Sequence, residues 1–221
     1  MLAILAARGV NIFVVHAPGE VTLYASYLRV PPERIVFVPI QRGVIEYARQ
    51  EDLISPFILS MGSAQRDYAS LVAAVTDTGI RTIIITRPDI IATLPKTDEV
   101  ELRSGLTQAE CLEVLAGAAF SVIPISNMTT ASGQITIVTS MRLGVAVVAT
   151  RCPGTEGYIE DGVTGSLVAP FDVAGLRQAI LELWRNVEVR NALALQGKHH
   201  ADHNFSDEGA AQALHAIIAS L

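Results

Sequence analysis

Residues 121–165 read SVIPISNMTTASGQITIVTSMRLGVAVVATRCPGTEGYIEDGVTG, and this stretch decides the fold because apolar strands alternate in it with polar turns. The pattern predicts a strand ending at Pro124, a turn-rich loop, a helix over 134–143 closed by Gly144, and a second strand over 145–150. A helix that follows such a loop presents free backbone N–H groups and the positive end of its dipole, which favour a phosphate. A βαβ unit with an ordinary polar loop fits the same spacing.

The composition of the 221-residue chain, with 50% hydrophobic and 17% charged residues, predicts a well-buried α/β globule. The net charge of −6 comes without a run of Lys or Arg, which argues against nucleic-acid or membrane-surface binding. Any phosphate site would therefore be local. Cys111 and Cys152 lie far apart and favour a reducing cytoplasm over a disulfide or zinc framework.

The apolar N-terminal segment is interrupted by Arg8 and Gly9 too early to span a bilayer, so we expect neither a signal peptide nor an anchor. Strands and helices alternate through residues 56–185, which predicts a Rossmann-like, doubly wound parallel sheet with helices on both faces. Residues 87–99 are predicted to form a loop. Further upstream, two strand-plus-helix units are too few to cover both faces of a parallel sheet.

We therefore divide the chain into four parts: residues 1–42 as the remnant of another domain, 43–55 as a linker, 56–205 as a nucleotide-binding domain and 206–221 as a C-terminal helix. A sheet remnant with open faces also favours a homodimer or a partner that supplies the missing domain.

Three segments, LSMGSAQRDYASLVAAV (59–75), VELRSGLTQAECLEVLAGAAFSVIPI (100–125) and GQITIVTSMRLGVAVVATRCPGTEGYIEDGVTGSLVAPFD (133–172), occur in this order. Together they resemble the C-terminal, donor-binding half of retaining nucleotide-sugar glycosyltransferases with the GT-B fold, of the group 1 or family 4-like type. Residues 11–40 resemble the end of that family's acceptor-side N-terminal domain. The resemblance covers nearly the whole chain.

One departure from the family concerns two glutamates that the family carries seven residues apart, one near the sugar and one at the ribose hydroxyls. The aligned positions here are Ala131 and Thr139, so this recognition cannot be transferred to a glutamate pair. Ser132-Gly133-Gln134 resembles a subgroup of the family, and we expect Gln134 with Thr136 or Thr139 to substitute. Ser63 stands where many relatives have a second basic residue.

The resemblance implies a nucleoside-diphosphate sugar as donor substrate, held without a metal or other cofactor, with positive charge stabilising the leaving diphosphate. Arg66 is the first candidate, because a guanidinium suits phosphate oxygens; a solvated residue at a helix start is the alternative. For Glu156 a structural role in its loop is slightly favoured, and His16 is not expected to act as a base. The expected donor-binding residues are Gly62, Arg66, Arg87, Gly105, Leu106, Ser132, Gly133, Gln134, Thr136, Thr139 and Glu156.

Two functions fit these observations, and no catalytic residue is assigned for either. The first is the donor half of a retaining hexosyltransferase, expected to be inactive as this chain because the acceptor-side domain is mostly absent. The second is a non-catalytic nucleotide-sugar-binding or interaction subunit, which the missing glutamates favour. A nucleotide-sugar epimerase would want acidic and histidine residues in the cleft that we do not find. His199, His200 and His203 have a spacing that suits a metal, but a surface helix end is expected there.

Overall fold

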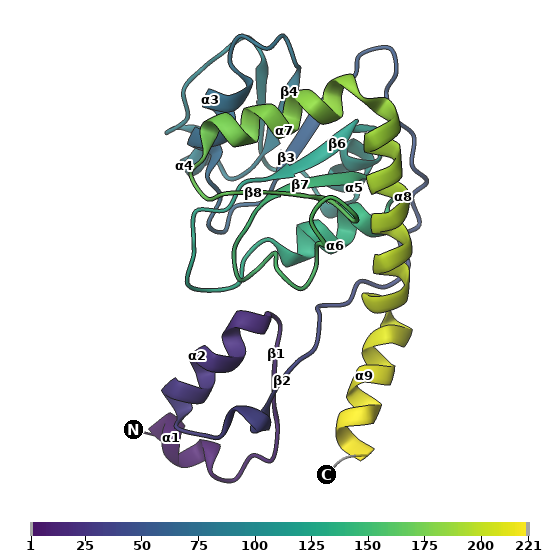
Figure 1. Cartoon of the computed structure of the whole chain (residues 1–221). Coiled ribbons are helices and arrows are strands. Elements are labelled where there is room, and N and C mark those ends of the chain that lie inside the picture. The colour runs from purple at the N-terminus through teal and green to yellow at the C-terminus, as the bar shows by residue number, and fades with distance from the viewer. Residues whose placement is uncertain (1, 220–221) are drawn as a thin grey trace.

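The computed structural model describes residues 2–219, which form a six-stranded and a two-stranded parallel sheet (Figure 1). The larger sheet has the strand order β5-β4-β3-β6-β7-β8. Its strands are β3 (Ile58–Met61), β4 (Thr82–Ile85), β5 (Val100–Arg103), β6 (Phe120–Ile123), β7 (Ala146–Thr150) and β8 (Ser166–Val168). This order is typical of doubly wound nucleotide-binding sheets, in which the winding direction reverses between two central strands, here β3 and β6. The predicted fold class is confirmed.

Helices cover both faces of the six-stranded sheet. The helices α3 (Tyr68–Val75) and α7 (Val173–Arg185) lie on one face, and α5 (Gln108–Gly117) and α6 (Gln134–Arg142) on the other (Figure 1). The long helix α8 (Val187–Asn204) packs against α6 and β7, and α9 (Asp207–Ala219) follows it. The predicted final helix extends to residue 221, so its last two positions lie outside the described residues.

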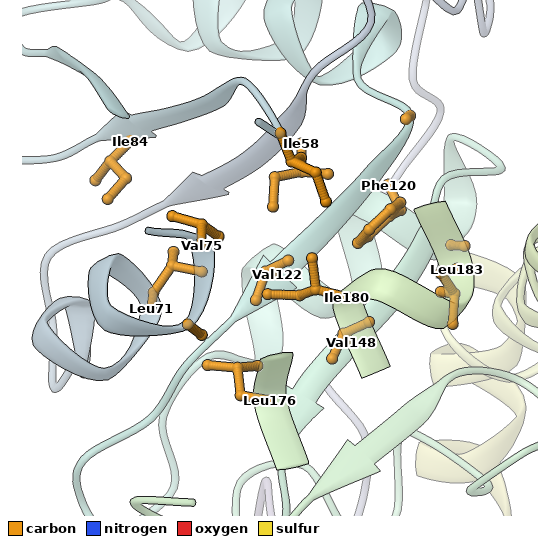
Figure 2. Packing of buried hydrophobic residues seen from close by; sticks show 14 of the residues in the cluster. Ile58, Leu71, Val75, Ile84, Phe120, Val122, Val148, Leu176, Ile180 and Leu183 are labelled. Atoms are coloured by element: carbon orange, nitrogen blue, oxygen red, sulfur yellow. The ribbon is translucent and has the colours of Figure 1, made fainter. Parts of the chain in front are cut away.

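The core between the sheet and α3 and α7 consists mainly of aliphatic side chains, with the rings of Phe120 and Tyr68. Figure 2 shows Ile58, Phe120 and Val148 of the strands facing Leu71 of α3 and Ile180 of α7. All four residues of β4 and all four of β6 are buried, because helices cover both sides of these strands. β4 and β6 are thus packed on both faces, and the loops at their carboxyl ends follow directly from buried strands.

Side-chain caps fix several of the helix starts that the sequence predicts. Asp67 accepts a hydrogen bond from the backbone N–H of Ser70 at 3.2 Å, and Thr107 with Glu110 forms a complete capping box. The prediction of a loop over 87–99 is wrong in its first part, where Pro88–Ile91 forms α4. Proline stands at the first helical position there, where its missing N–H and fixed φ angle are tolerated.

The N-terminal unit contains α1 (Leu2–Ala7), β1 (Phe13–Val15), α2 (Pro18–Leu28), the short 3-10 helix η1 (Pro32–Arg34) and β2 (Ile35–Phe37). It meets the larger unit at Tyr158, whose hydroxyl donates to the His16 carbonyl at 2.7 Å and accepts from the Ile40 N–H at 2.9 Å. The carboxyl end of β1 therefore faces the loop that follows β7. The proposed division into four parts stays a prediction. Within residues 2–219, no helix is both long and apolar enough to cross a membrane.

Candidate functional site

A pocket of about 490 Å³ lies at the carboxyl ends of β3, β4 and β5, beside the first turn of α6. We call it the carboxyl-end pocket. Its volume falls within the range of small-molecule sites, and its position beside the reversal of strand order is where doubly wound sheets bind ligands. Its lining residues are Met61, Gly62, Ser63, Ile85, Thr86, Arg87, Pro88, Gly105, Leu106, Cys111 and Thr136.

The turn after β3 is shaped so that a guanidinium can lie against its backbone. Gly62 has φ +116°, and a Cβ atom there would lie 2.6 Å from Nη2 of Arg66. The hydroxyl of Tyr68 donates a 2.5 Å hydrogen bond to the Gly62 carbonyl. Burial raises the pKa of Tyr68 to about 12, so this hydroxyl stays protonated and remains a donor. Only glycine fits this turn while Arg66 keeps its place.

Arg66 spans from this turn to the start of α6. Its guanidinium donates to the carbonyls of Met61 (3.3 Å) and Ala64 (2.7 Å). It also donates to the hydroxyls of Ser132 (3.3 Å) and Thr136 (3.2 Å), which lie on either side of the helix start. Burial lowers the pKa of the guanidinium, although an arginine stays charged at neutral pH.

The partners of Arg66 are all uncharged. Among residues 2–219, no carboxylate pairs with this guanidinium, and its hydrogen bonds end on carbonyl and hydroxyl oxygens. A cation that is partly removed from water without a counter-charge is costly unless an anion joins it. This arrangement favours a negatively charged ligand beside Arg66.

The first turn of α6 adds backbone donors to the same place. Gly133 is its N-cap residue, with φ +91° and no side-chain capping hydrogen bond. Ser132 fixes the preceding loop by donating from its hydroxyl to the Ala64 carbonyl at 2.9 Å. Gly154 packs from the other side, where a Cβ atom would lie 2.4 Å from the Ser132 nitrogen. The helix N-terminus and the guanidinium thus converge, as phosphate binding requires.

The two loops after β4 and β5 contribute three of the expected residues. Arg87 donates to both carboxylate oxygens of Asp89, at 3.1 and 3.0 Å, and these hydrogen bonds lower the pKa of Asp89. Its charge is therefore already partnered, in contrast to that of Arg66. Gly105 has φ +75° and open space where a Cβ would stand, and Leu106 lines the pocket beside it.

Six expected residues are not part of the pocket lining in the described part of the chain. Arg66, Ser132 and Gly133 lie directly beside it, because Arg66 contacts Gly62 and Thr136 of the lining and bonds to Ser132. The other three are Gln134, Thr139 and Glu156. Gln134 is buried in the first turn of α6, while the Thr139 hydroxyl donates to the Ile135 carbonyl at 2.7 Å within the helix. Glu156 is exposed. Their expected roles stay predictions.

Sequence reasoning missed two lining residues that carry useful chemistry, Thr86 and Cys111. Thr86 directly follows β4, and its hydroxyl lies 3.2 Å from that of Ser63. Cys111 stands in the first turns of α5, where burial and then the charge of Glu110 raise the pKa of its thiol. A polar residue after a buried strand is a usable signal for Thr86, but the sequence offers none for Cys111.

The three histidines of α8 behave as residues of a surface helix. His199 and His203 are exposed, and the His200 ring packs edge-on against Phe205 at 5.1 Å. Burial lowers the pKa of His200. Across residues 2–219, no group of three or more His, Cys, Asp or Glu side chains is placed to hold a metal ion.

A comparison with protein-family models shows to which family the chain belongs. The family model described as "Glycosyl transferases group 1" matches residues 67–186, which is more than half of the sequence. The chain therefore belongs to this glycosyltransferase family, as the order of motifs predicts. A search of curated protein sequences finds no match.

Similar solved structures have the same fold. Sucrose-phosphate synthase from Thermosynechococcus elongatus superposes with a TM-score of 0.78 at 16% identity, covering 94% of this chain and 57% of that protein. HepE from Anabaena, in complex with UDP and glucose, gives 0.79 at 15%, covering 100% and 66%. WaaG, a glycosyltransferase involved in lipopolysaccharide biosynthesis, gives 0.72 at 16%, covering 90% and 60%. The chain thus has a GT-B-type fold and spans less than two thirds of each relative.

Proposed function

We propose that this chain binds a nucleoside-diphosphate sugar at the carboxyl-end pocket and serves as the donor-binding part of a retaining glycosyltransferase. One observation carries the proposal: Arg66, with uncharged partners only in the described chain, lies against the first turn of α6. Family membership and the UDP complex of the similarly folded HepE support a nucleotide as the ligand.

In this proposal the pyrophosphate lies between Arg66 and the α6 N-terminus. The guanidinium and the N–H groups after Gly133 would stabilise the negative charge that develops on the leaving diphosphate. The nucleoside would extend along Gly105 and Leu106, which line the same pocket. No metal is needed in this scheme, since Arg66 and the helix dipole supply the positive charge.

A second function, donor binding without turnover, is favoured by the chemistry of the pocket lining. None of its residues in the described chain is acidic. Of the carboxylates next to the lining, Asp89 is paired with Arg87 and Glu110 caps the start of α5. We therefore propose that the 221-residue chain by itself binds the donor but does not transfer its sugar. Release or transfer of radiolabelled sugar by this chain would contradict that part of the proposal.

Cys111 provides a direct test of nucleotide binding, because it lines the pocket while Cys152 is only 3% exposed. UDP, GDP and ADP, each alone and as a nucleotide sugar, would be compared for protection of Cys111 against alkylation, with modified peptides identified by mass spectrometry. The alkylation should be run at mildly alkaline pH, because the pKa of this thiol is raised.

We expect one nucleotide family to slow modification of Cys111 and to raise the unfolding temperature. A ligand at 100 times its dissociation constant stabilises the folded state by about 2.7 kcal/mol, which a thermal scan resolves readily. Cys152, modified only after denaturation, is the internal control for folding. If every nucleotide leaves both the labelling rate and the unfolding temperature unchanged, the proposed function is wrong.

A further inference from the structure

A second pocket, of about 540 Å³, lies at the amino ends of the strands. We call it the amino-end pocket. Ala119 and Gly144 line it and stand just before β6 and β7, and the segment 45–51 and helix α8 complete it. Helix α6 starts at the carboxyl-end pocket and ends here at Arg142, about 13 Å further along its axis. The two pockets therefore lie on opposite edges of the sheet.

Four cationic side chains line the amino-end pocket: Arg49, Arg142, Arg190 and Lys198. Glu51 is the single acidic residue of the lining in the described chain. Outside the lining, Asp202 pairs with Arg142 at 3.4 Å and with Lys198 at 2.7 Å. Four positive charges thus face two negative ones, a local surplus of two in a chain whose net charge is −6.

Two of these cations share one carboxylate. Glu51 pairs through one oxygen with Arg49 at 2.9 Å and through the other with Arg190 at 2.7 Å. The Arg190 side chain is only 7% exposed. Its Nε group, which is buried, has no hydrogen-bond partner in the described structure. Burial, and the nearby charge of Arg190, lower the pKa of Arg49. The positive charge here is therefore only partly compensated.

Helix capping explains why these cations gather at this edge. Arg49 donates to the Ala116 carbonyl at the end of α5 (2.7 Å), and Lys198 donates to the Arg142 carbonyl at the end of α6 (3.1 Å). Arg190 donates to the Leu183 carbonyl near the end of α7 at 3.4 Å. Each helix end carries a partial charge of about −0.5, so the three ends reduce the surplus of two without cancelling it.

Apolar and aromatic residues also line the amino-end pocket. They include Ile45, Leu143 and Ala194, together with Tyr47 and Leu195, which are 36% and 67% exposed. The exposed tyrosine ring offers a stacking surface for a flat or hydrophobic ring face. The lining thus combines cationic side chains with an aromatic ring, within a volume typical of small-molecule sites.

We propose that the amino-end pocket binds a small phosphate monoester, with its phosphate among Arg142, Arg190 and Lys198 and its sugar or nucleoside ring on Tyr47. A phosphate monoester carries a charge of about −1.5 to −2 at neutral pH, which is opposite in sign to the surplus that the ion pairs and helix ends leave uncancelled. The proposal stands independently of the donor assignment at the carboxyl-end pocket.

The test is a titration of the isotopically labelled chain at pH 7.5, followed through backbone amide NMR shifts. Inorganic phosphate, glucose 6-phosphate and AMP are the probes. We expect saturable shifts at Gly144 and Asn191, which line the amino-end pocket. Shifts at Gly62 and Gly105 report the carboxyl-end pocket instead, so failure at one site is distinguishable from failure at the other.

Two lysine variants form a matched pair, because Lys96 and Lys198 are the two lysines of the chain and Lys96 is exposed and lies outside the pocket. Lys198→Gln should weaken binding of both esters by about fivefold or more, and Lys96→Gln should leave it unchanged. The Lys198 side chain is 45% exposed, so the variant should fold. Tyr47→Ala should weaken the esters but not inorganic phosphate.

Absence of shifts at Gly144 and Asn191 with all three probes at about 10 mM would overturn the proposal, because the dissociation constants would then lie well above that concentration. Equal affinity in the Lys198→Gln and Lys96→Gln proteins would overturn it as well. If inorganic phosphate binds as tightly as both esters, the ring contact with Tyr47 is wrong.

Discussion

Arginine side chains lie both at the carboxyl ends and at the amino ends of the strands of the six-stranded sheet, but their partners differ. At the carboxyl edge Arg66 rests on carbonyls and hydroxyls around a glycine turn, with no acidic partner in the described chain. At the amino edge Arg190 is buried in an ion pair with Glu51 at 2.7 Å. The comparison teaches that the partner sets how much charge an arginine can offer: Arg190 stabilises the fold through its ion pair and shares its charge between Glu51 and any bound anion, whereas Arg66, with neutral partners, offers its whole charge to an anion.

The largest expected effect on stability comes from breaking the ion pair at the amino edge. Arg190→Met would leave Glu51 partly buried with half of its counter-charge, and loss of one partner from a buried pair costs about 3–5 kcal/mol. Urea unfolding of this variant measures the loss. Arg66→Gln should cost only about 1 kcal/mol, because the loss of its hydrogen bonds is offset by removal of a partly buried charge that has no counter-charge in the described chain.

Arg185→Met, at an exposed position in the last turn of α7, controls for the loss of an arginine as such. Equal destabilisation by Arg190→Met and Arg66→Gln would contradict the distinction between the two edges.

The next effect tests how tightly the carboxyl edge is packed. Gly154→Ala would place a Cβ atom 2.4 Å from the Ser132 nitrogen, and the clash is with backbone that cannot rotate away. We expect a loss of about 2–3 kcal/mol in unfolding free energy, together with weaker nucleotide binding. Gly9→Ala is the matched control, because its nearest neighbour is the Ala6 carbonyl oxygen at 3.9 Å. Similar stability of the two variants would show that Gly154 does not fix the loop before α6.

A further stability effect depends on pH and involves Tyr68 and Tyr158, the second of which joins the N-terminal unit to the larger one. Burial raises the pKa of Tyr68 and Tyr158 from 10.0 to about 12. The folded state favours the neutral hydroxyl. The stability that each buried tyrosine contributes is therefore fully present below pH 10 and is lost as the pH rises towards 12. Each tyrosine contributes on the order of 2 kcal/mol across that window.

Tyr158→Phe should flatten the loss between pH 10 and 12 and cost about 1 kcal/mol at neutral pH, where its bonds to His16 and Ile40 are missing. Tyr27→Phe, at a residue that is 65% exposed, should leave the alkaline profile of unfolding unchanged. If Tyr158→Phe leaves the pH dependence of unfolding between pH 10 and 12 unchanged, groups other than Tyr158 cause the loss of stability.

Much of the fold was accessible from sequence because its signals are local. Buried strands read as short apolar runs, and the caps Asp67 and Thr107 mark helix starts through side chains three residues from their partners. Helix α4 was missed because Pro88 reads as a loop residue, although proline suits the first position of a helix.

The candidate site was only partly predictable because its decisive contacts are long-range. The motif order pointed to Arg66, Ser132, Gly133 and Thr136, but not to the hydrogen bonds that join the guanidinium to the two hydroxyls, such as that to Thr136, 70 residues away. The pairing of Arg190 with Glu51 spans 139 residues and leaves no local signal. Hydrophobic periodicity constrains which residues are buried, whereas charge pairing across the fold requires coordinates.

The central claim is that Arg66 binds the diphosphate of the donor, and calorimetric titration of the Arg66→Gln variant tests it most directly. The ligands are the nucleoside diphosphate that protects Cys111 best and the corresponding nucleoside, and Arg185→Gln is the control protein. The account predicts that Arg66→Gln weakens the diphosphate by about tenfold to hundredfold, as loss of charge-assisted hydrogen bonds implies, with the nucleoside unaffected. Unchanged affinity of the diphosphate in a folded Arg66→Gln protein would contradict it.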